Sequence, residues 1–186
     1  EAYKWSKMTG KLEGIPALNT DTTTNKFCIA MSKKKGTICN VCYSWNMLKT
    51  FRKNAVPRFK SNSDYLSYKI HDYDYLPKVP SIVARFNGHG ELINRYHLEN
   101  LFRICDNQPK KYWLVHKLLD EGRKKPPNII LIYSNPYPDL KSELPREFDK
   151  VFNNVTNPND TSINCDRKCI ECMMCYTLGD KTINII

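Results

Sequence analysis

The sequence has no apolar run that approaches the roughly 18 residues needed to cross a membrane. It contains no segment repeated at a fixed period and no low-complexity tract. The chain opens with the polar, charged stretch Glu1 to Lys7, and this stretch is unlike the apolar core of a secretory signal. These absences argue against a membrane-spanning protein, a repeat array and a secreted protein. We expect a cytoplasmic location.

Acidic side chains are outnumbered by basic ones, 19 to 29, and the net charge is +10. Such an excess favours an anionic partner such as nucleic acid, DNA or RNA, or a phosphate-bearing cofactor. A basic protein without any such partner would have the same composition, so charge alone leaves both interpretations open. The length of 186 residues predicts one domain over residues 1–186.

Cysteine is missing from most of the chain and gathers near its two ends. The N-terminal set spans Cys28 to Cys42 in a Cys-x10-Cys-x2-Cys pattern, and the C-terminal set spans Cys165 to Cys175. Cysteines two or three residues apart can turn their sulfurs toward one metal centre. We therefore expect metal sites in segments 1–60 and 160–186, with these ligands: Cys28, Cys39 and Cys42 in the first, and Cys165, Cys169, Cys172 and Cys175 in the second.

Two other uses of cysteine have to be weighed. Disulfides require an oxidising compartment, which the polar N-terminal stretch does not indicate. Burial in a core is the second use, and it fits Cys105, the one cysteine between the two sets. Leu98, Leu101, Phe102 and Cys105 follow the i, i+3, i+4, i+7 spacing of a helix that faces a core.

The spacing of the C-terminal set favours an iron–sulfur cluster but leaves zinc open. A zinc site normally uses two Cys-x2-4-Cys pairs on separate turns, and here only two residues separate the pairs. Four cysteines at spacings of two to three are typical of a [4Fe-4S] cluster. The N-terminal set has three cysteines, so a cluster there would leave one iron without a cysteine ligand. Lys33, Lys34 and Lys35 lie within that set, where positive charge favours the thiolate form.

Hydrophobic patterning predicts an α/β fold with a largely parallel sheet. Apolar runs indicate strands, and the stripe around Cys105 indicates a helix between two of them. A break is expected near Pro57, with a helix starting among the capping residues at 61–64. The expected strands are Ser81–Phe86, Lys111–Val115, Asn128–Tyr133, Phe148–Val155 and Thr182–Ile186; the expected helices are Tyr43–Phe51, Asn94–Asp106 and Lys117–Glu121.

Polar residues follow three of the expected strands. In parallel α/β folds, ligands bind at the carboxyl ends of the strands. Glycine allows close backbone approach, and a carboxylate accepts hydrogen bonds from an amino group. A local turn or a locally satisfied histidine would also account for each segment taken alone. Together they predict one cofactor-binding rim, made of Gly88, Gly90, Glu91, His116, Lys117 and Ser134.

The order of these segments resembles the phage-encoded "gene product eighty-eight" family over roughly residues 10 to 186. The resemblance rests on Cys39-Asn-Val-Cys42-Tyr43, then Ile82-Val-Ala-Arg85-Phe86 before Gly88-His-Gly90-Glu91, then Trp113-Leu-Val-His-Lys117, then Ile129 to Ser134, and finally the C-terminal cysteines. That family is itself similar to compact radical S-adenosylmethionine (SAM) enzymes. For a phage-encoded protein, the expected cytoplasm is that of the host cell.

The resemblance implies a partial β/α barrel with a cysteine-rich N-terminal loop and a C-terminal cysteine knot. It implies a [4Fe-4S] cluster on Cys28, Cys39 and Cys42, with Gly88, Gly90 and Glu91 at the amino group of SAM. It also implies an auxiliary cluster on the C-terminal set. The usual radical SAM signature is Cys-x3-Cys-x2-Cys. Here the N-terminal set matches only its second half, whereas Cys165 to Cys172 has the full spacing.

Two functions follow as hypotheses. In the first, the chain is an enzyme that cleaves SAM reductively and acts on nucleic acid or another anionic substrate. In the second, iron–sulfur or zinc sites are structural or redox-sensing, and the protein binds nucleic acid without catalysis. The residues expected to contact it are the cations Lys33 to Lys35, Arg52, Lys53, Lys124 and Lys125 and the aromatic residues Tyr43, Trp45 and Trp113.

Overall fold

The computed structural model describes residues 3–106, 111–115 and 125–186, with only the backbone described for 111–115. The strands form one six-stranded sheet in the order β1-β2-β3-β4-β5-β6, and every neighbouring pair is parallel. This confirms the predicted α/β class with a parallel sheet. The strands are β1 Ala17–Leu18, β2 Val83–Phe86, β3 Lys111–Val115, β4 Ile129–Ser134, β5 Lys150–Asn154 and β6 Thr182–Ile185.

The sheet is open, since β1 and β6 are its two edges and the described residues form no closed barrel. Because each strand pairs with the next one along the chain, every crossover moves one position in the same direction. Because all neighbouring strands are parallel, the carboxyl ends of all six strands lie at the same end of the sheet. That end of the sheet is where the sequence predicts a ligand rim.

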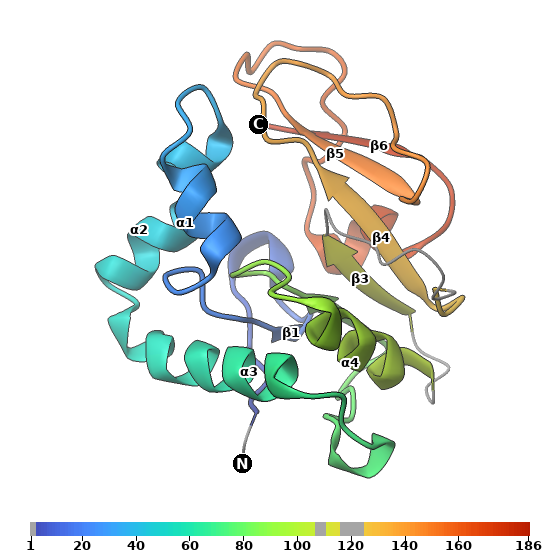
Figure 1. Cartoon of the computed structure of the whole chain (residues 1–186). Helices are drawn as coiled ribbons and strands as arrows, with labels where there is room; N and C mark the ends of the chain where they lie inside the picture. Colours follow the sequence, from blue (N-terminus) through green and yellow to red (C-terminus); the bar gives the residue numbers. More distant parts are fainter. Residues whose placement is uncertain (1–2, 107–110, 116–124) are drawn as a thin grey trace.

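The helices are α1 Lys26–Ser32, α2 Tyr43–Lys49, α3 Val56–Tyr68, α4 Arg95–Asp106 and the single turn α5 Cys169–Cys172. Short 3-10 turns join them, of which η1 Gly10–Leu12, η2 Ile38–Val41 and η3 Lys53–Ala55 matter below. Figure 1 shows α1, α2 and α3 following one another down one side of the molecule. No helix in the described residues has both the length and the apolar character needed to span a membrane.

One face of the sheet packs against α3 and α4. Ala84 and Phe86 of β2 and Leu131 of β4 meet Leu66 of α3 in this core. The stripe predicted around Cys105 is confirmed, because Leu98, Leu101, Phe102 and Cys105 of α4 are all buried in it. Burial raises the pKa of the Cys105 thiol well above its usual value, as expected of a cysteine that serves as a small apolar core residue.

The opposite face of the sheet packs against the C-terminal cysteine segment. Val83 of β2, Ile130 of β4 and Ile183 of β6 form this second core, together with the buried ring of Tyr176. Partly buried residues that pack against it include Cys165, Cys169, Met173, Met174 and Cys175. The strands are thus covered on both faces, which explains why β4 reads as a continuous apolar run.

Most predicted elements match the observed ones to within two residues, and two predictions were wrong. The helix expected to start at 61–64 begins at Val56, and Pro57 lies in its first turn. A proline is accepted there because its missing N–H would have no partner in the helix anyway. Cys28 lies in α1 and Cys39 in η2, so the N-terminal set is carried by helical turns rather than by an irregular loop. The predicted helix Lys117–Glu121 lies outside the described residues.

Candidate metal and cofactor pocket

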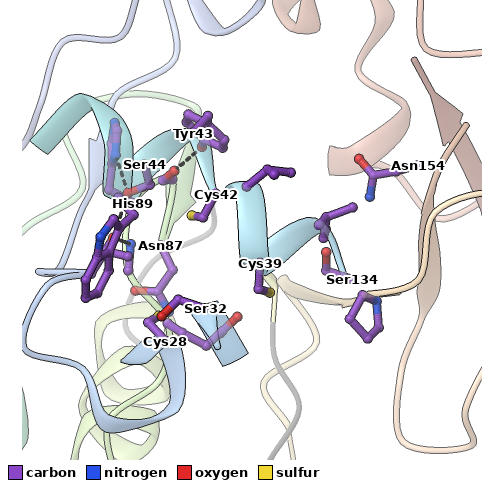
Figure 2. Close-up of a pocket in the computed structure, with 18 of the residues that line it drawn as sticks. Cys28, Ser32, Cys39, Cys42, Tyr43, Ser44, Asn87, His89, Ser134 and Asn154 are labelled. Atoms are coloured by element: carbon purple, nitrogen blue, oxygen red, sulfur yellow. Dashed lines mark hydrogen bonds between the residues drawn. The ribbon is translucent and has the colours of Figure 1, made fainter. Parts of the chain in front are cut away.

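A pocket of about 510 Å³ lies at the carboxyl ends of β2, β4, β5 and β6. This volume is within the range of small-molecule sites. Figure 2 shows Cys28, Cys39 and Cys42 along one side of the pocket, with Ser134 and Asn154 on the other. Its lining includes seven of the predicted site residues: Cys28, Cys39, Cys42, Gly88, Gly90, Glu91 and Ser134.

The three cysteines reach the pocket from three consecutive pieces of backbone. Cys28 lies in α1, Cys39 in η2, and Cys42 is the residue immediately before α2. The backbone N–H of Ile38 donates to the Pro136 carbonyl at 2.9 Å and thereby holds η2 against the loop that follows β4. The ten-residue gap after Cys28 is therefore filled by a helix and a turn that return the chain to the same pocket.

Asn25 joins the N-terminal cysteine segment to the glycine-rich turn. Its side-chain oxygen caps α1 by accepting from the N–H of Cys28 at 3.1 Å. Its amide nitrogen donates to the carbonyl oxygens of Glu91, at 2.9 Å, and Leu92, at 3.3 Å. One buried side chain thus fixes Cys28 relative to Glu91, although 63 residues separate them in the sequence.

The two glycines of this turn are required by protein packing. Gly90 has φ of +79°, and a Cβ there would lie 2.6 Å from the backbone oxygen of Thr20. A Cβ on Gly88 would lie 2.8 Å from the side-chain oxygen of Asn19. Both glycines let residues 87–91 lie directly against the segment that follows β1. The close approach predicted at these positions is therefore made by the protein's own backbone and side chains.

A chain of hydrogen bonds runs beneath the pocket through four residues. The Gly90 N–H donates to the Thr22 hydroxyl at 2.9 Å, and the Thr22 and Ser44 hydroxyls are 2.6 Å apart. The Ser44 hydroxyl lies 2.8 Å from Nδ1 of His89. In addition, the Tyr43 hydroxyl donates to the Gly88 carbonyl at 2.6 Å, which ties α2 to the same turn.

The hydrogen-bond partners in this chain assign a tautomer to His89. With the Gly90 N–H donating to Thr22, the hydroxyls are fully used when Thr22 donates to Ser44 and Ser44 donates to Nδ1. The imidazole then carries its proton on Nε2. Burial, with Arg52 and Arg85 nearby, lowers the pKa of His89 to about 4, so the ring is neutral at physiological pH. It also lines the pocket.

The C-terminal cysteines occupy a separate place on the sheet face. They line a small cavity of about 10 Å³ together with Met173, Tyr176 and Ile183. The backbone N–H of Cys165 donates to the Asn184 carbonyl of β6 at 3.1 Å, and Lys11 Nζ donates to the Cys165 carbonyl at 2.8 Å. None of the eight cysteines forms a disulfide, and the predicted C-terminal cysteine knot is not confirmed.

Cationic side chains surround the C-terminal set. Burial raises the pKa of Cys165 and, to about 12, that of Cys175, while Lys11 opposes the shift at the first and Arg85 at the second. Lys150, which is almost fully buried, interacts with Cys175. Arg85 also lines the larger pocket, so this one residue of β2 lies between the two cysteine sets.

Neither set is a closed metal site as it stands. Across residues 3–106 and 125–186, no three Cys, His, Asp or Glu side chains are arranged as a ready-made ligand group. The donor chemistry nevertheless fits a thiolate-bound metal: three cysteines share the large pocket, and four interact with one another at the small cavity. The sulfurs of each set would have to turn further inward to share one centre.

Some of the predicted rim cannot be placed, and some of the pocket was not predicted. His116 and Lys117 lie outside the described residues. Thr22, Asn25, Ser44 and His89 hold the pocket together, yet no periodicity or spacing in the sequence marks them. The capping preference of Asn25 before a helix was the one local sign of its role.

Comparison with known proteins gives no match: no family model, no curated protein and no solved structure is significantly similar to this chain. Function must therefore be argued from the pocket itself.

Proposed function

We propose that this chain is an iron–sulfur protein of the radical SAM-like kind, with Cys28, Cys39 and Cys42 as ligands of a [4Fe-4S] cluster. The single observation that supports this most is the meeting of these three cysteines with the Gly88-to-Glu91 turn in one pocket. The pocket lies at the carboxyl edge of a parallel sheet, the usual position of ligands in such folds. We place the chain, on its sequence order, in the phage "gene product eighty-eight" family.

The strand order supports the finer description of the fold. Consecutive parallel strands that advance in one direction are the arrangement of a β/α barrel, and an open row of six would make a partial one. Residues 1–186 would form a single domain of this kind. The C-terminal cysteines pack against one face of it.

The residues of the pocket have distinct roles in this proposal. Cys28, Cys39 and Cys42 would hold the cluster, which when bound would supply an electron to SAM. Glu91 would accept hydrogen bonds from the amino group of SAM, and Asn25 would hold Glu91 in register with Cys28. The neutral His89 would offer an N–H donor to a ligand without adding charge.

The C-terminal set is proposed as a second metal site, an auxiliary [4Fe-4S] cluster or a zinc ion. A metal bound by four thiolates is anionic, and Lys11, Arg85 and Lys150 would balance that charge. Its cysteines pack against the second core, so a metal there would also fasten the C-terminal segment to the sheet.

Metal analysis of protein purified without oxygen tests the proposal. Roughly four to eight irons per chain, with matching sulfide and broad absorption near ~400 nm, would support one or two [4Fe-4S] clusters. Addition of SAM should then change the spectrum of the reduced cluster in the intact protein. The same addition should leave a Cys42→Ala variant unchanged, because that variant keeps only two ligands of the N-terminal set.

A second candidate function is a nucleic-acid-binding or redox-sensing protein with structural metal sites. The packing of the C-terminal cysteines into a hydrophobic core favours this alternative, since structural metals commonly hold such segments in place. Zinc without sulfide, and no spectral response to SAM, would establish this alternative and exclude the radical SAM-like function.

A further inference from the structure

The positive charge of the chain is concentrated in one continuous segment. Residues 22–63 contain nine lysines and arginines and no aspartate or glutamate. We call this stretch the acid-free segment. The remaining 144 residues carry 20 basic and 19 acidic side chains, so they are almost neutral. Nearly all of the net charge of +10 therefore belongs to less than a quarter of the chain.

The structure places this charge on one side of the molecule. The acid-free segment forms α1, η2, α2, η3 and most of α3, which succeed one another along that side (Figure 1). Arg52 is half-buried, and the other eight cations are exposed: Lys26, Lys33, Lys34, Lys35, Lys49, Lys53, Arg58 and Lys60. The surface is thus an extended band of cations rather than a point charge.

Carboxylates from elsewhere in the described chain do little to neutralise this band. Among the described residues, Lys60 alone of the nine forms an ion pair, with Asp64 at 2.5 Å. Lys34 instead donates to the Tyr137 hydroxyl at 2.6 Å, and Lys49 lies 4.3 Å from the centroid of the Trp45 ring. Cations left without acidic partners attract a polyanion, and its counterions are released on binding.

Exposed apolar side chains lie among these cations. Val41 is 73% exposed, Tyr43 58% and Phe51 77%. Two of the three are aromatic rings, which offer flat surfaces for stacking. Bases in a duplex are already stacked and paired, whereas unpaired bases are free to stack on protein rings. A band of phosphate-binding cations interleaved with open rings therefore suits a single strand.

The band is also one wall of the pocket. Cys28, Cys39, Cys42, Tyr43 and Trp45 all belong to the acid-free segment and line the pocket. The rest of the lining comes from the ends of β2, β4, β5 and β6, and Ser134 and Asn154 lie across the pocket from the cysteines (Figure 2). A strand bound along the cations would pass directly beside the pocket, and Tyr43 would lie both on the strand's path and at the pocket's edge.

We propose that the acid-free segment is the docking surface for single-stranded nucleic acid. The phosphates of the nucleic acid contact Lys33 to Lys35, Lys49 and Lys53, and its bases stack on Tyr43 and Phe51. The strand delivers one nucleotide to the pocket as the substrate of the chemistry there. This last step rests on the proposed function, whereas docking itself does not require a metal.

Fluorescence anisotropy with labelled single-stranded oligonucleotides of mixed sequence, DNA and RNA, tests the docking over a series of salt concentrations. The triple variant K33Q/K34Q/K35Q should bind at least tenfold more weakly at low salt. The slope of log affinity against log salt should also fall by about 2, as expected for three lost contacts to a single strand. The matched control is K69Q/K78Q/K181Q, which removes three exposed lysines outside the segment and should bind within twofold of the parent.

A second variant separates stacking from charge. Phe51→Ala removes an exposed ring, and affinity should fall about tenfold with an unchanged salt slope. The proposal is overturned by binding that does not depend on salt, by equal losses in the two triple variants, or by a duplex of the same length binding as tightly as the single strand.

The two proposals fail in distinguishable ways. Protein from which the metal has been removed should keep its affinity for the single strand, because the lysines and rings of the docking surface are not metal ligands. Strand binding without iron in the parent protein would overturn the cluster and leave the docking surface standing. Iron, sulfide and a SAM response without strand binding would overturn the docking surface and leave the cluster standing.

Discussion

The Ser44 hydroxyl lies 2.8 Å from Nδ1 of His89, and both residues are almost completely buried beneath the pocket. The pair joins α2 to the turn after β2, two elements 45 residues apart. Through Thr22 the same chain of bonds reaches the Gly90 N–H. The orientation of the pocket's histidine therefore depends on two hydroxyl groups that do not themselves perform chemistry.

Ser44→Ala should release His89 from its fixed tautomer. The substitution leaves Nδ1 and the Thr22 hydroxyl buried without this partner, which should lower the free energy of unfolding by about 1–3 kcal/mol. Nitrogen NMR of the histidine side chains should show a single Nε2–H tautomer in the parent and a shifted or mixed one in the variant. Ser32→Ala is the control: Ser32 also lines the pocket, but its hydroxyl donates within α1 to the Ile29 carbonyl. An unchanged His89 spectrum in Ser44→Ala would show that the Ser44 hydroxyl does not determine the tautomer of His89.

Gly90→Ala should be strongly destabilising. An alanine at φ of +79° is disfavoured by about 1–2 kcal/mol, and its Cβ would also contact the Thr20 backbone at 2.6 Å. We expect a combined loss of several kcal/mol in chemical denaturation. Gly179→Ala is the matched control, because nothing lies within 4 Å of a Cβ there and the backbone is not left-handed. Equal stability of the two variants would show that residues 87–91 can move away from Thr20.

The sequence predicted the sheet well because strands that are buried on both faces appear in the sequence as continuous apolar runs. The apolar run at β4 and the helical stripe of α4 depend on local period alone. The start of α3 was misjudged because proline reads as a breaker, and only the surrounding structure shows that Pro57 occupies the tolerant first turn.

The sequence predicted the candidate reactive residues of the site, but it did not reveal the polar residues that hold them in place. Cysteine spacing identified the thiols, and position after a strand identified Glu91 and Ser134 as pocket residues. Asn25, Thr22 and Ser44 are ordinary polar residues whose long-range partners lie 22 to 68 residues away. No pattern in one sequence reports such pairings, since they depend on how β1, α2 and the turn after β2 come together.

Metal content of single cysteine variants should separate ligands from core residues. Cys39→Ala should remove the metal of the N-terminal set and leave that of the C-terminal set, because the two sets line different cavities. Cys105→Ala should leave both unchanged, since Cys105 is buried within α4 in the other core. Iron, sulfide and zinc measured per chain decide the matter. Equal losses from the two variants would contradict the assignment of ligands.

Acid should destabilise the fold through buried histidines, and His97 of α4 is the clearest case. It is completely buried, its Nδ1 accepts from the Ile93 N–H at 3.3 Å, and burial lowers its pKa to about 3. The unfolded chain takes up a proton near pH 6.5, so between about pH 6.5 and 3 it holds more protons than the folded chain. The contribution of neutral His97 to the free energy of unfolding should therefore be fully present above about pH 6.5, and it should decrease steadily as the pH drops through this window.

His97→Asn tests that linkage without removing the acceptor for Ile93. Asparagine does not titrate, so the slope of unfolding free energy against pH should become shallower by up to one proton in this window, whatever the variant's absolute stability. His89 contributes in the same direction down to about pH 4, and a residual slope should remain for that reason. Urea denaturation at pH 7, 6, 5 and 4 measures the slope. Parallel curves for parent and variant would mean that His97 is already protonated in the folded protein.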